Sequence, residues 1–190
     1  MFCMGRAKKF SREEVLDKTI AVFWKHGFAQ TTVQDLERAT RVNKSGLYTE
    51  FEGKEDLFVA GMRRYFETLQ NLGTLTRKPL GWQNVEDFVK LCDGDWGCWD
   101  QKGCFSVNSM RELPNLPREA RELMIASAMQ IRQGLVRNLS GCRQKKKDND
   151  ALADLILTFF IGISLQQNFS PTKKQVADKI AKFMRLIREL

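Results

Sequence analysis

Apolar residues recur along most of this 190-residue chain at spacings of three and four, the period of an amphipathic α-helix. The first run begins at Ser11, where Ser11 and Glu14 can form a capping box and Phe10 can pack onto Val15 across the helix start. Gly27 follows the run and can act as its C-cap. The pattern predicts a helix with a buried stripe of Leu16, Ile20, Phe23 and Trp24.

Two shorter runs follow in the segment TTVQDLERATRVNKSGLYTEFEGK. Thr32 can cap the first, and Asp35 can complete a capping box. Asn43 can cap the second, which we expect to begin at Lys44 and end near Phe51. The first helix has a narrow apolar face of Val33, Leu36 and Ala39, and the second buries Leu47 and Phe51. The segment predicts two short helices joined by a tight turn.

The rest of the chain keeps the helical period after a glycine- and proline-containing loop at residues 73–83. We expect further helices at 55–72, from 84 to 94 or 99, and at 104–112, 117–139, 150–168 and 172–190. No segment alternates apolar and polar residues with period two, so we expect no sheet. The prediction is an all-α fold of about nine helices.

Polar side chains mark the outward face of the second short helix. Lys44, Ser45, Tyr48 and Thr49 occupy its first two turns, opposite its apolar pair. A helix-turn-helix contacts base edges with the N-terminal residues of its second helix, and these residue types suit that contact. We interpret residues 31–54 as a DNA-reading element.

The charge balance fits an anionic partner only in part. The chain has a net charge of +8, but residues 1–60 hold ten Lys/Arg and nine Asp/Glu. The DNA interpretation therefore depends on where the cations lie rather than on their number. The basic run at 143–147 is typical of a solvated loop. A basic arm with Arg6, Lys8 and Lys9 can follow the phosphate backbone or be a frayed terminus, and both interpretations stay open.

Several function classes find no support in the sequence. The first residues lack the apolar core of a secretory signal, and the apolar segment 151–165 is too short to span a bilayer, so we expect a cytoplasmic protein without a membrane partner. Five cysteines without CxxC pairs predict free thiols and no zinc site. The one histidine, His26, sits at a helix end, where it can cap the helix. We see no nucleophile–base pair and no phosphate-binding loop, so we expect neither an enzyme nor a cofactor.

The last two helices are apolar over unusually wide faces. Such faces can pair with the same helices of a second chain in an isologous four-helix bundle, or they can complete the core of a single chain. We favour the homodimer. Its predicted interface is Leu152, Leu155, Ile156, Phe159, Phe160, Ile163, Val176, Ile180, Phe183, Met184 and Ile187.

The middle helices carry aromatic and methionine residues that could line a ligand pocket. An aromatic and methionine set at helical spacing is more often ordinary core than a binding site, so both interpretations are kept. The candidate lining residues are Trp82, Phe88, Trp96, Trp99, Phe105, Met110, Met124 and Met129.

Residues 9–64 resemble the TetR-type transcriptional regulators. The resemblance consists of an amphipathic first helix ending in HGF, the TT start, and K-S-G-L-Y-x-x-F-x-x-K-x-x-L. It implies an all-α homodimer, and DNA contacts at Thr31, Thr32, Lys44, Ser45, Gly46, Tyr48, Thr49 and Lys54. Thr40 and Glu50 depart from the usual pattern. A carboxylate facing DNA would be repelled by phosphate, so we expect Glu50 to point away.

The segment GCFSVN at residues 103–108 resembles one branch of the same family, which contains the N-ethylmaleimide-responsive repressor. That likeness makes Cys104 a candidate thiol sensor. Such chemistry requires a lowered pKa, from a helix N-terminus or a cation such as the neighbouring Lys102. Cys104 is otherwise a small buried core residue.

Taken together, these features predict a sequence-specific DNA-binding regulator. The implied division is a basic arm at 1–10, a helix-turn-helix domain at 11–53, a connecting helix at 54–72, and a regulatory and dimerisation domain at 84–190. We expect a repressor that binds a near-palindromic double-stranded operator and is released by an unidentified small-molecule or electrophilic effector. The alternative is an architectural DNA-binding protein that needs no ligand.

Overall fold

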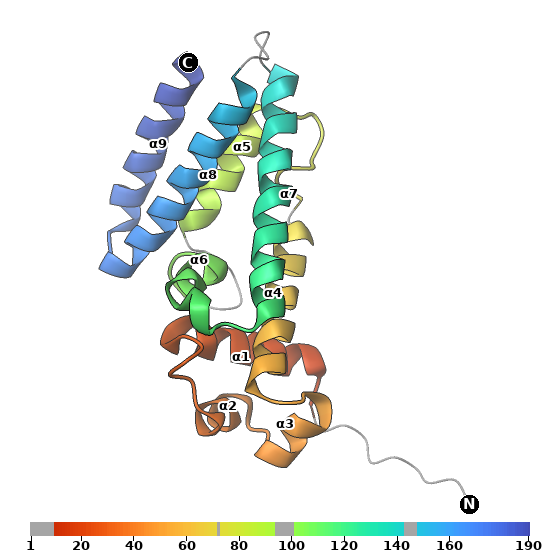
Figure 1. Ribbon diagram of the computed structural model, residues 1–190. Helices are drawn as coiled ribbons and strands as arrows, with labels where there is room; N and C mark the ends of the chain where they lie inside the picture. The colour runs from red at the N-terminus through yellow and green to blue at the C-terminus, as the bar shows by residue number, and fades with distance from the viewer. Residues whose placement is uncertain (1–9, 72, 94–100, 143–147) are drawn as a thin grey trace, which may run out of the picture.

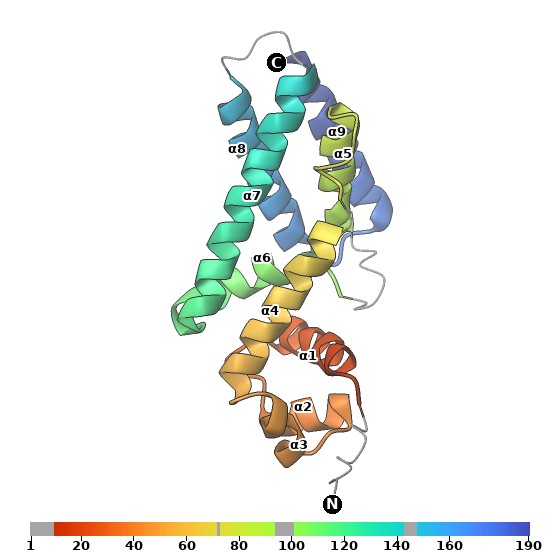
Figure 2. The same ribbon diagram turned by 90° about the vertical axis from the view of Figure 1, so that its right-hand side faces the viewer.

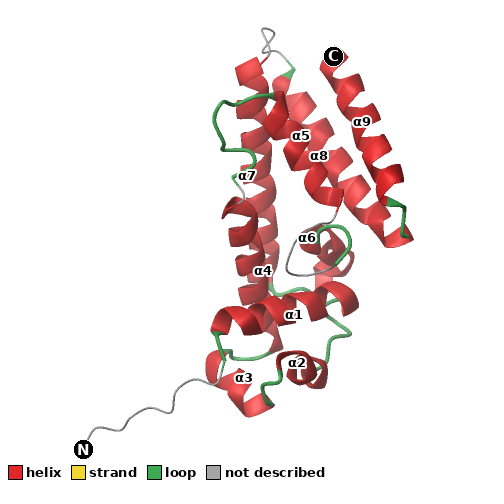
Figure 3. Ribbon diagram, turned by 180° about the vertical axis from the view of Figure 1, so that it is seen from behind, coloured by secondary structure: helices red, strands yellow, loops and turns green. Residues whose placement is uncertain are grey.

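The computed structural model describes residues 10–71, 73–93, 101–142 and 148–190. These residues form nine α-helices and three short 3-10 helices, with no strand among them (Figure 3). The predicted all-α fold is confirmed. The α-helices are α1 Arg12–His26, α2 Val33–Thr40, α3 Lys44–Glu50, α4 Lys54–Asn71, α5 Trp82–Lys90, α6 Phe105–Ser109, α7 Arg118–Cys142, α8 Asn149–Gln166 and α9 Lys173–Glu189. The 3-10 helices are η1 Leu91–Asp93, η2 Met110–Asn115 and η3 Gln167–Phe169.

The helices form two groups joined by α4. Figures 1 and 2 show α1, α2 and α3 at one end of the molecule, and α5, α7, α8 and α9 at the other. α4 packs against α1 in the first group and against α7 in the second. We call α1–α3 the helix-turn-helix unit and α5–α9 the body. The long α4 therefore connects the helix-turn-helix unit to the body and packs against both.

Capping residues define the helix-turn-helix unit much as the sequence predicts. Ser11 accepts a hydrogen bond from the Glu14 amide, and Thr32 and Asp35 form a complete capping box. The buried position at the end of α2 is Thr40 rather than Ala39. Its hydroxyl donates to the Leu36 carbonyl at 2.7 Å, which satisfies the buried polar group. The other predicted core residues are buried: Leu16, Ile20, Phe23, Trp24, Leu36, Leu47 and Phe51.

The body is built around α7. This helix packs against α8, α5 and α4, and α9 lies against α5 and η1. Two predicted boundaries change. α5 begins at Trp82, two residues earlier than expected, and the segment predicted as one helix over 104–112 divides into α6 and η2. Pro114 lies inside η2, and because proline has no backbone N–H it cannot continue an α-helical hydrogen-bond ladder.

Most of the predicted dimer-interface residues are buried inside the chain itself, so this part of the prediction is wrong. Within one chain, α8 faces α7 and α9 faces α5, and these contacts cover the apolar stripes. The buried residues are Leu152, Ile156, Phe160, Ile163, Val176, Ile180, Met184 and Ile187. Phe159 and Phe183 stay partly buried and stack on each other with ring centroids 3.7 Å apart. Leu155 alone among the predicted set is exposed, at 44%.

The helical stretch Asn149–Phe169 is long and apolar enough to cross a membrane by length and composition alone. It extends beyond residues 151–165, which are too short to span a bilayer. One face of α8, with Leu152, Ile156 and Phe160, is buried in the core of the body. A core helix of a globular protein has this composition, and we assign α8 that place.

Candidate nucleic-acid interface and ligand cavity

α3 is a short helix fixed at its start by a side-chain cap and at its base by apolar contacts. The Asn43 side chain accepts a hydrogen bond from the Gly46 amide at 2.8 Å. Leu47 is buried at 1% exposure and Phe51 at 2%. A Cβ at Gly46 would lie 2.8 Å from Val42 Cγ1, so glycine lets the helix approach the turn before it. Gly46, predicted as a DNA contact, thus has a packing role.

The outward face of α3 is exposed, as the amphipathic pattern predicts. Lys44, Ser45, Tyr48 and Thr49 are exposed in its first two turns. The Lys44 ammonium lies 5.7 Å from the centre of the Tyr48 ring, and no carboxylate pairs with that ammonium among the described residues. The Thr49 hydroxyl donates to the Ser45 carbonyl at 2.8 Å. This face therefore presents a cation, an aromatic ring and hydroxyl groups to solvent.

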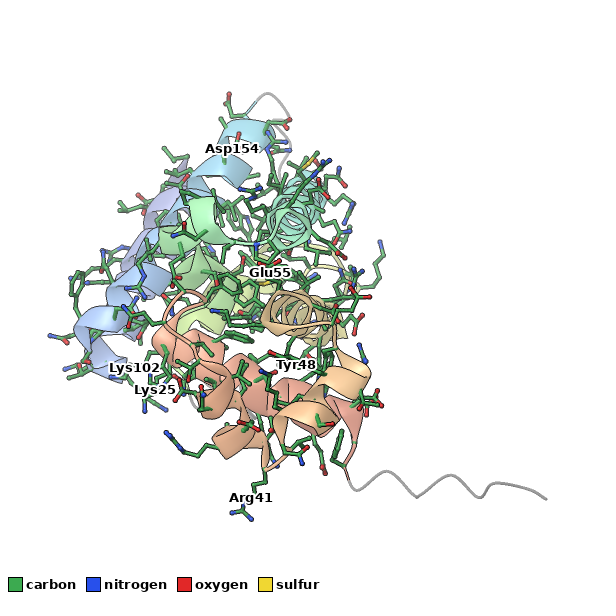
Figure 4. All side chains as sticks on the ribbon, turned by 60° about the horizontal axis from the view of Figure 1, so that its bottom comes forward. Lys25, Arg41, Tyr48, Glu55, Lys102 and Asp154 are labelled. Atoms are coloured by element: carbon green, nitrogen blue, oxygen red, sulfur yellow. The ribbon has the colours of Figure 1, made fainter. Side chains whose placement is uncertain are left out.

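Thr32 and Arg41 are exposed at the two ends of α2. Thr32 is exposed at the start of α2, although its hydroxyl is bonded to the Asp35 carboxylate at 2.6 Å. Arg41 lies in the turn between α2 and α3 with a left-handed backbone, φ 59°. Figure 4 shows its side chain directed away from the rest of the molecule. Sequence reasoning missed Arg41, although a basic residue in the turn of a helix-turn-helix is a usable signal. The arm residues Arg6, Lys8 and Lys9 lie outside the described residues.

Two predicted DNA contacts are corrected by the structure. The Thr31 side chain is 2% exposed, and its hydroxyl donates to the Gly27 carbonyl at 2.6 Å. The Lys54 ammonium donates to the carbonyls of Phe28 at 3.0 Å, Ala29 at 3.4 Å and Thr31 at 3.1 Å. An ammonium has three N–H donors, and all three donors of Lys54 bind carbonyls of the loop between α1 and α2. Both side chains shape the unit instead of facing outward.

Glu50 points away from the exposed face of α3, as predicted. Its carboxylate lies 3.7 Å from the Arg12 guanidinium, which also donates to the Glu50 carbonyl at 3.2 Å. The side chain is 16% exposed. The negative charge is thus held against α1, where it does not oppose a polyanion at Lys44 and Tyr48.

The helix-turn-helix unit is joined to the body through α6 and η2. The Phe105 ring of α6 lies within 5.7 Å, centre to centre, of the rings of Trp24, Phe58 and Tyr65. Trp24 Nε1 also donates to the carbonyl of Lys102 at 3.0 Å. This aromatic cluster makes Phe105 a contact between the two groups of helices, which is why it does not line a pocket as predicted.

A second contact reaches the loop between α1 and α2 directly. The Glu112 carboxylate accepts a hydrogen bond from the Ala29 amide at 2.6 Å. The same carboxylate fills the space beside Gly27, whose backbone has φ +80°. Lys54 holds the carbonyls of this loop and Glu112 holds one of its amides. The position of α2 and α3 is therefore tied to both α4 and η2.

A largely apolar cavity of about 400 Å³ lies within the body. Its lining includes three of the predicted residues: Phe88, Met110 and Met124. Trp82 instead lies under the Arg188 guanidinium, 5.8 Å from its ring centre, and Met129 is 58% exposed, so both predictions are wrong. Trp96 and Trp99 lie outside the described residues. Sequence reasoning missed the remaining apolar walls: Phe66, Leu69, Leu75, Leu91, Val107, Ile131, Leu157, Phe160 and Ile161.

The segment GCFSVN, residues 103–108, contributes Cys104, Ser106 and Val107 to the lining of this cavity. Gly103 has φ +79°, and a Cβ there would lie 2.5 Å from the Ser164 carbonyl oxygen of α8, so only glycine fits. The Asn108 side chain donates to the Lys102 carbonyl at 3.1 Å and accepts from Asn168 at 2.9 Å. These bonds hold the segment between α8 and η3. Its residue pattern therefore has a structural basis.

Cys104 lies between the cavity and the aromatic cluster. Its side chain is 4% exposed and lines the cavity, and the Tyr65 hydroxyl donates to its sulfur at 3.2 Å. Burial raises the pKa of the Cys104 thiol, although the Tyr65 hydrogen bond acts in the opposite direction. The lowered pKa that thiol-sensor chemistry requires is therefore not found at Cys104. Lys102 is exposed and supplies only its backbone carbonyl to the surrounding bonds.

The exposed face of α3 lies in the part of the chain that matches a known family. A family model described as "Bacterial regulatory proteins, tetR family" matches residues 15–60, from α1 to the start of α4. The HTH-type transcriptional repressor ComR of Escherichia coli (strain K12) is 44% identical over 63 residues, 33% of this chain and 30% of ComR. Residues 15–60 of this chain carry the DNA-binding region of the TetR family, and the resemblance predicted from the sequence is confirmed. The family and its members compared here are transcriptional regulators rather than enzymes, as predicted.

Two other TetR-family relatives match beyond the helix-turn-helix unit. The uncharacterized HTH-type transcriptional regulator YezE of Bacillus subtilis (strain 168) is 36% identical over 124 residues, 62% of this chain and 63% of YezE. The biofilm operon icaADBC negative transcriptional regulator IcaR of Staphylococcus aureus is 25% identical over 175 residues, 90% of this chain and 92% of IcaR. The chain thus matches less than two thirds of the length of ComR and of YezE.

Solved TetR-family structures share the whole fold. A regulator from Cytophaga hutchinsonii has a TM-score of 0.81 at 18% identity, covering 96% of this chain and 98% of that one. Reduced Escherichia coli NemR gives 0.71 at 17% identity, covering 90% and 93%. A cysteine mutant of CifR in complex with 26 bp double-strand operator DNA gives 0.78 at 19% identity, covering 95% and 98%. At these identities the likeness extends to the fold and no further.

Proposed function

We propose that this chain is a cytoplasmic transcriptional repressor that binds a near-palindromic operator as a homodimer. An effector entering the body cavity releases it from DNA. The TetR-family match over residues 15–60 supports the DNA-binding part. ComR is a repressor and IcaR a negative regulator, which supports repression. The operator complex of CifR supports the same mode of action.

The observation that carries the proposal is the exposed face of α3. Lys44, Ser45, Tyr48 and Thr49 are exposed at the N-terminal end of the helix, where a helix-turn-helix contacts base edges. The Lys44 ammonium suits a guanine edge or a phosphate, and the Tyr48 ring suits a phosphate or a thymine methyl group. Thr32 and Arg41 are exposed at the two ends of α2 and suit backbone phosphates.

The dimer places two such faces on one operator. Half-sites read by paired recognition helices lie about 34–36 Å apart, one turn of DNA. On the outer side of α8 and α9, Leu155 is 44% exposed and Leu186 60% exposed, and the stacked pair Phe159 and Phe183 is partly exposed. We assign the dimer contact to this outer side, in place of the buried stripes that the sequence indicated. Leu155→Glu should shift the chain to monomer in sedimentation equilibrium.

The effector acts through α6 and η2. Val107 and Met110 line the cavity, while Phe105 and Glu112 of the same two helices contact the helix-turn-helix unit. A ligand that displaces Val107 or Met110 therefore moves groups that hold α1 and the α1–α2 loop. Two copies of α3 then lose the spacing that one operator requires.

A genomic-fragment selection followed by fluorescence anisotropy tests the DNA-binding proposal. The wild-type chain should enrich short discrete sites, whereas even coverage would favour a ligand-independent architectural protein. Tyr48→Ala should weaken binding to the selected site by about fivefold to 150-fold, because a specific contact contributes roughly 1–3 kcal/mol. Phe169→Ala is the matched control, since Phe169 is an aromatic residue 85% exposed in η3. Unchanged affinity of the Tyr48 variant would refute the role given to α3.

Thiol modification is the second candidate trigger. Cys104 lines the cavity, so a small electrophile in the cavity reaches its sulfur, and solved relatives include reduced NemR and cysteine mutants of CifR. N-ethylmaleimide should then release operator DNA from the wild type and not from Cys104→Ser. Equal release from both would assign the trigger to reversible ligand binding or to another cysteine.

A further inference from the structure

The cavity in the body has a marked division between apolar walls and one charged end. The walls come from α4, α5, α7 and α8, with Phe66, Phe88, Ile131, Leu157 and Phe160 among them. Arg137 is the only charged residue among the described residues of the lining. Lysine, aspartate and glutamate are absent from the described lining residues. A ligand in this cavity meets a single positive charge and no negative one.

Arg137 has no partner of its own among the described residues. No hydrogen bond or ion pair involves its side chain, which is exposed. Arg132, less than two turns earlier on α7, shows the contrast. It lies outside the cavity lining, and its guanidinium bonds to Asp154 at 2.6 Å and to Asp150 at 2.9 Å. The guanidinium at the cavity is thus available to a carboxylate that the protein does not supply.

The neutral polar groups of the lining are already engaged or too weak to replace that charge. Gln70 of α4 donates to the side-chain oxygen of Gln130 of α7 at 3.0 Å, across the cavity wall. Thr76 donates to the Gly73 carbonyl at 3.2 Å. Hydroxyl and amide groups orient a ligand but do not neutralise an ionised group. Charge recognition is therefore left to Arg137.

The cavity follows α7 over a considerable length. Its lining on this helix extends from Met124 to Arg137, roughly 20 Å at 1.5 Å per residue. Near Arg137, the loop with Leu75 packs over the helix. A Cβ at Gly134 would lie 3.1 Å from the Leu75 side chain, and buried Asn138 donates to the Leu75 carbonyl at 2.9 Å. The loop is pinned there, so the charged end has a defined wall.

We propose that the cavity binds an amphipathic carboxylate, with its apolar body along α7 and its anionic head on Arg137. A volume of about 400 Å³ falls in the range of small-molecule sites. A planar guanidinium pairs with a carboxylate through two parallel hydrogen bonds. The apolar tail occupies the end near Val107 and Met110, beside the α6–η2 connection to the helix-turn-helix unit. This inference rests on the proposed function only for its regulatory consequence.

Isothermal titration of the full-length chain with three ten-carbon probes tests the proposal. Decanoate, decan-1-ol and decylamine share one apolar body and differ in head-group charge. Decanoate should bind roughly threefold to tenfold more tightly than decan-1-ol. This is the range expected for an exposed ion pair with added hydrogen bonds. Decylamine should bind weakest. Equal affinities for decanoate and decan-1-ol, or tightest binding of decylamine, would overturn the proposal, as would no binding of any probe.

Variants locate the head group. Arg137→Gln should abolish the preference for decanoate over decan-1-ol, and Arg137→Lys should restore part of it. Arg185→Gln is the matched control, because Arg185 is an exposed arginine on α9 outside the cavity lining. A preference that survives in Arg137→Gln refutes the assignment. Ala128→Phe should remove binding of all probes by filling the cavity, with Leu157→Phe as the second choice if circular dichroism shows a folding defect.

The same preparations separate this inference from the proposed function. If operator binding is intact and decanoate is not preferred, the ligand class is wrong and the repressor assignment is untouched. If decanoate binds through Arg137 while no discrete operator is selected, the ligand site stands and the repressor assignment falls.

Discussion

The helix-turn-helix unit and the body are organised by polar contacts of very different range. In α3, the Asn43 side chain binds the Gly46 amide, three residues along the chain. In the body, buried Asn138 of α7 binds the Leu75 carbonyl, and its side-chain oxygen accepts from Asn84 at 2.8 Å. The first contact forms within one turn of helix. The second requires helices and a loop from distant parts of the chain to be packed already.

This difference explains what each region offers to a partner. Local caps complete α3 without using the outward side chains, so Lys44 and Tyr48 stay available at the surface. Long-range packing in the body leaves a cavity at which Arg137 meets no carboxylate of the part of the chain that the structure describes. Substitutions on α3 should therefore change DNA binding at constant stability. Substitutions in the contacts between the two regions should change stability first.

The largest effect is expected at Phe105, where the two regions meet. Phe105→Ala removes a ring that is 1% exposed and contacts Trp24, Phe58 and Tyr65. Truncation of a buried phenylalanine costs about 3–5 kcal/mol, and we expect that loss of unfolding free energy in urea denaturation. Phe169→Ala should stay within about 0.5 kcal/mol, because its ring is exposed. A comparable change in both variants would show that the cluster does not join the regions.

Two lysines of the same motif provide the next test. Lys54→Met should cost about 1–3 kcal/mol, because three hydrogen bonds from a charged donor are lost. Lys44→Met should leave stability within about 0.5 kcal/mol and reduce the log–log salt slope of operator binding by about 0.9 for each Lys44, which is about 1.8 for the homodimer. Urea denaturation and anisotropy at several salt concentrations measure the two quantities. If Lys54→Met reduces the salt slope and leaves stability unchanged, Lys54 contacts phosphate as the sequence predicted.

A smaller effect is expected at Glu112. Glu112→Gln weakens the charge-assisted bond to the Ala29 amide by about 0.5–1.5 kcal/mol but keeps an acceptor oxygen. Hydrogen exchange at Ala29 should accelerate. Glu119→Gln is the control, since Glu119 pairs with Arg63 and not with the α1–α2 loop. Unchanged exchange at Ala29 in the Glu112 variant would mean that η2 does not hold this loop.

The smallest effect concerns the reactivity of Cys104. Burial raises its pKa, so the neutral thiol persists to higher pH than in an ordinary cysteine. The folded chain then keeps a proton that the unfolded chain has lost, and stability falls as pH rises above the usual thiol range. Peptide mapping at about pH 7 and about pH 9 should show that N-ethylmaleimide modifies exposed Cys142 before Cys104. The ratio of the two modification rates should be smaller at the higher pH. Earlier modification of Cys104 at neutral pH would contradict this.

The local signals of the chain were sufficient for the all-α class, for α2 and α3, and for the exposed face of α3. Capping boxes, the cap at Asn43 and the apolar pair Leu47 and Phe51 act within a few residues of one another. Such signals do not depend on the rest of the fold, so they are legible in the sequence. The outward direction of Tyr48 follows from them directly. The burial of Thr31 does not, because the loop that contains Thr31 is held by the distant residues Lys54 of α4 and Glu112 of η2.

Tertiary structure alone decided which apolar and charged residues were left over after packing. The stripes of α8 and α9 face α7 and α5 within one chain, a choice that periodicity cannot make. Lys54 and Lys44 are both lysines of one motif. Three carbonyls of the α1–α2 loop accept hydrogen bonds from Lys54 and not from Lys44. Arg132 and Arg137 share one helix, and only the first meets carboxylates of α8. Long-range packing, which no local pattern encodes, determined the cavity and its charge.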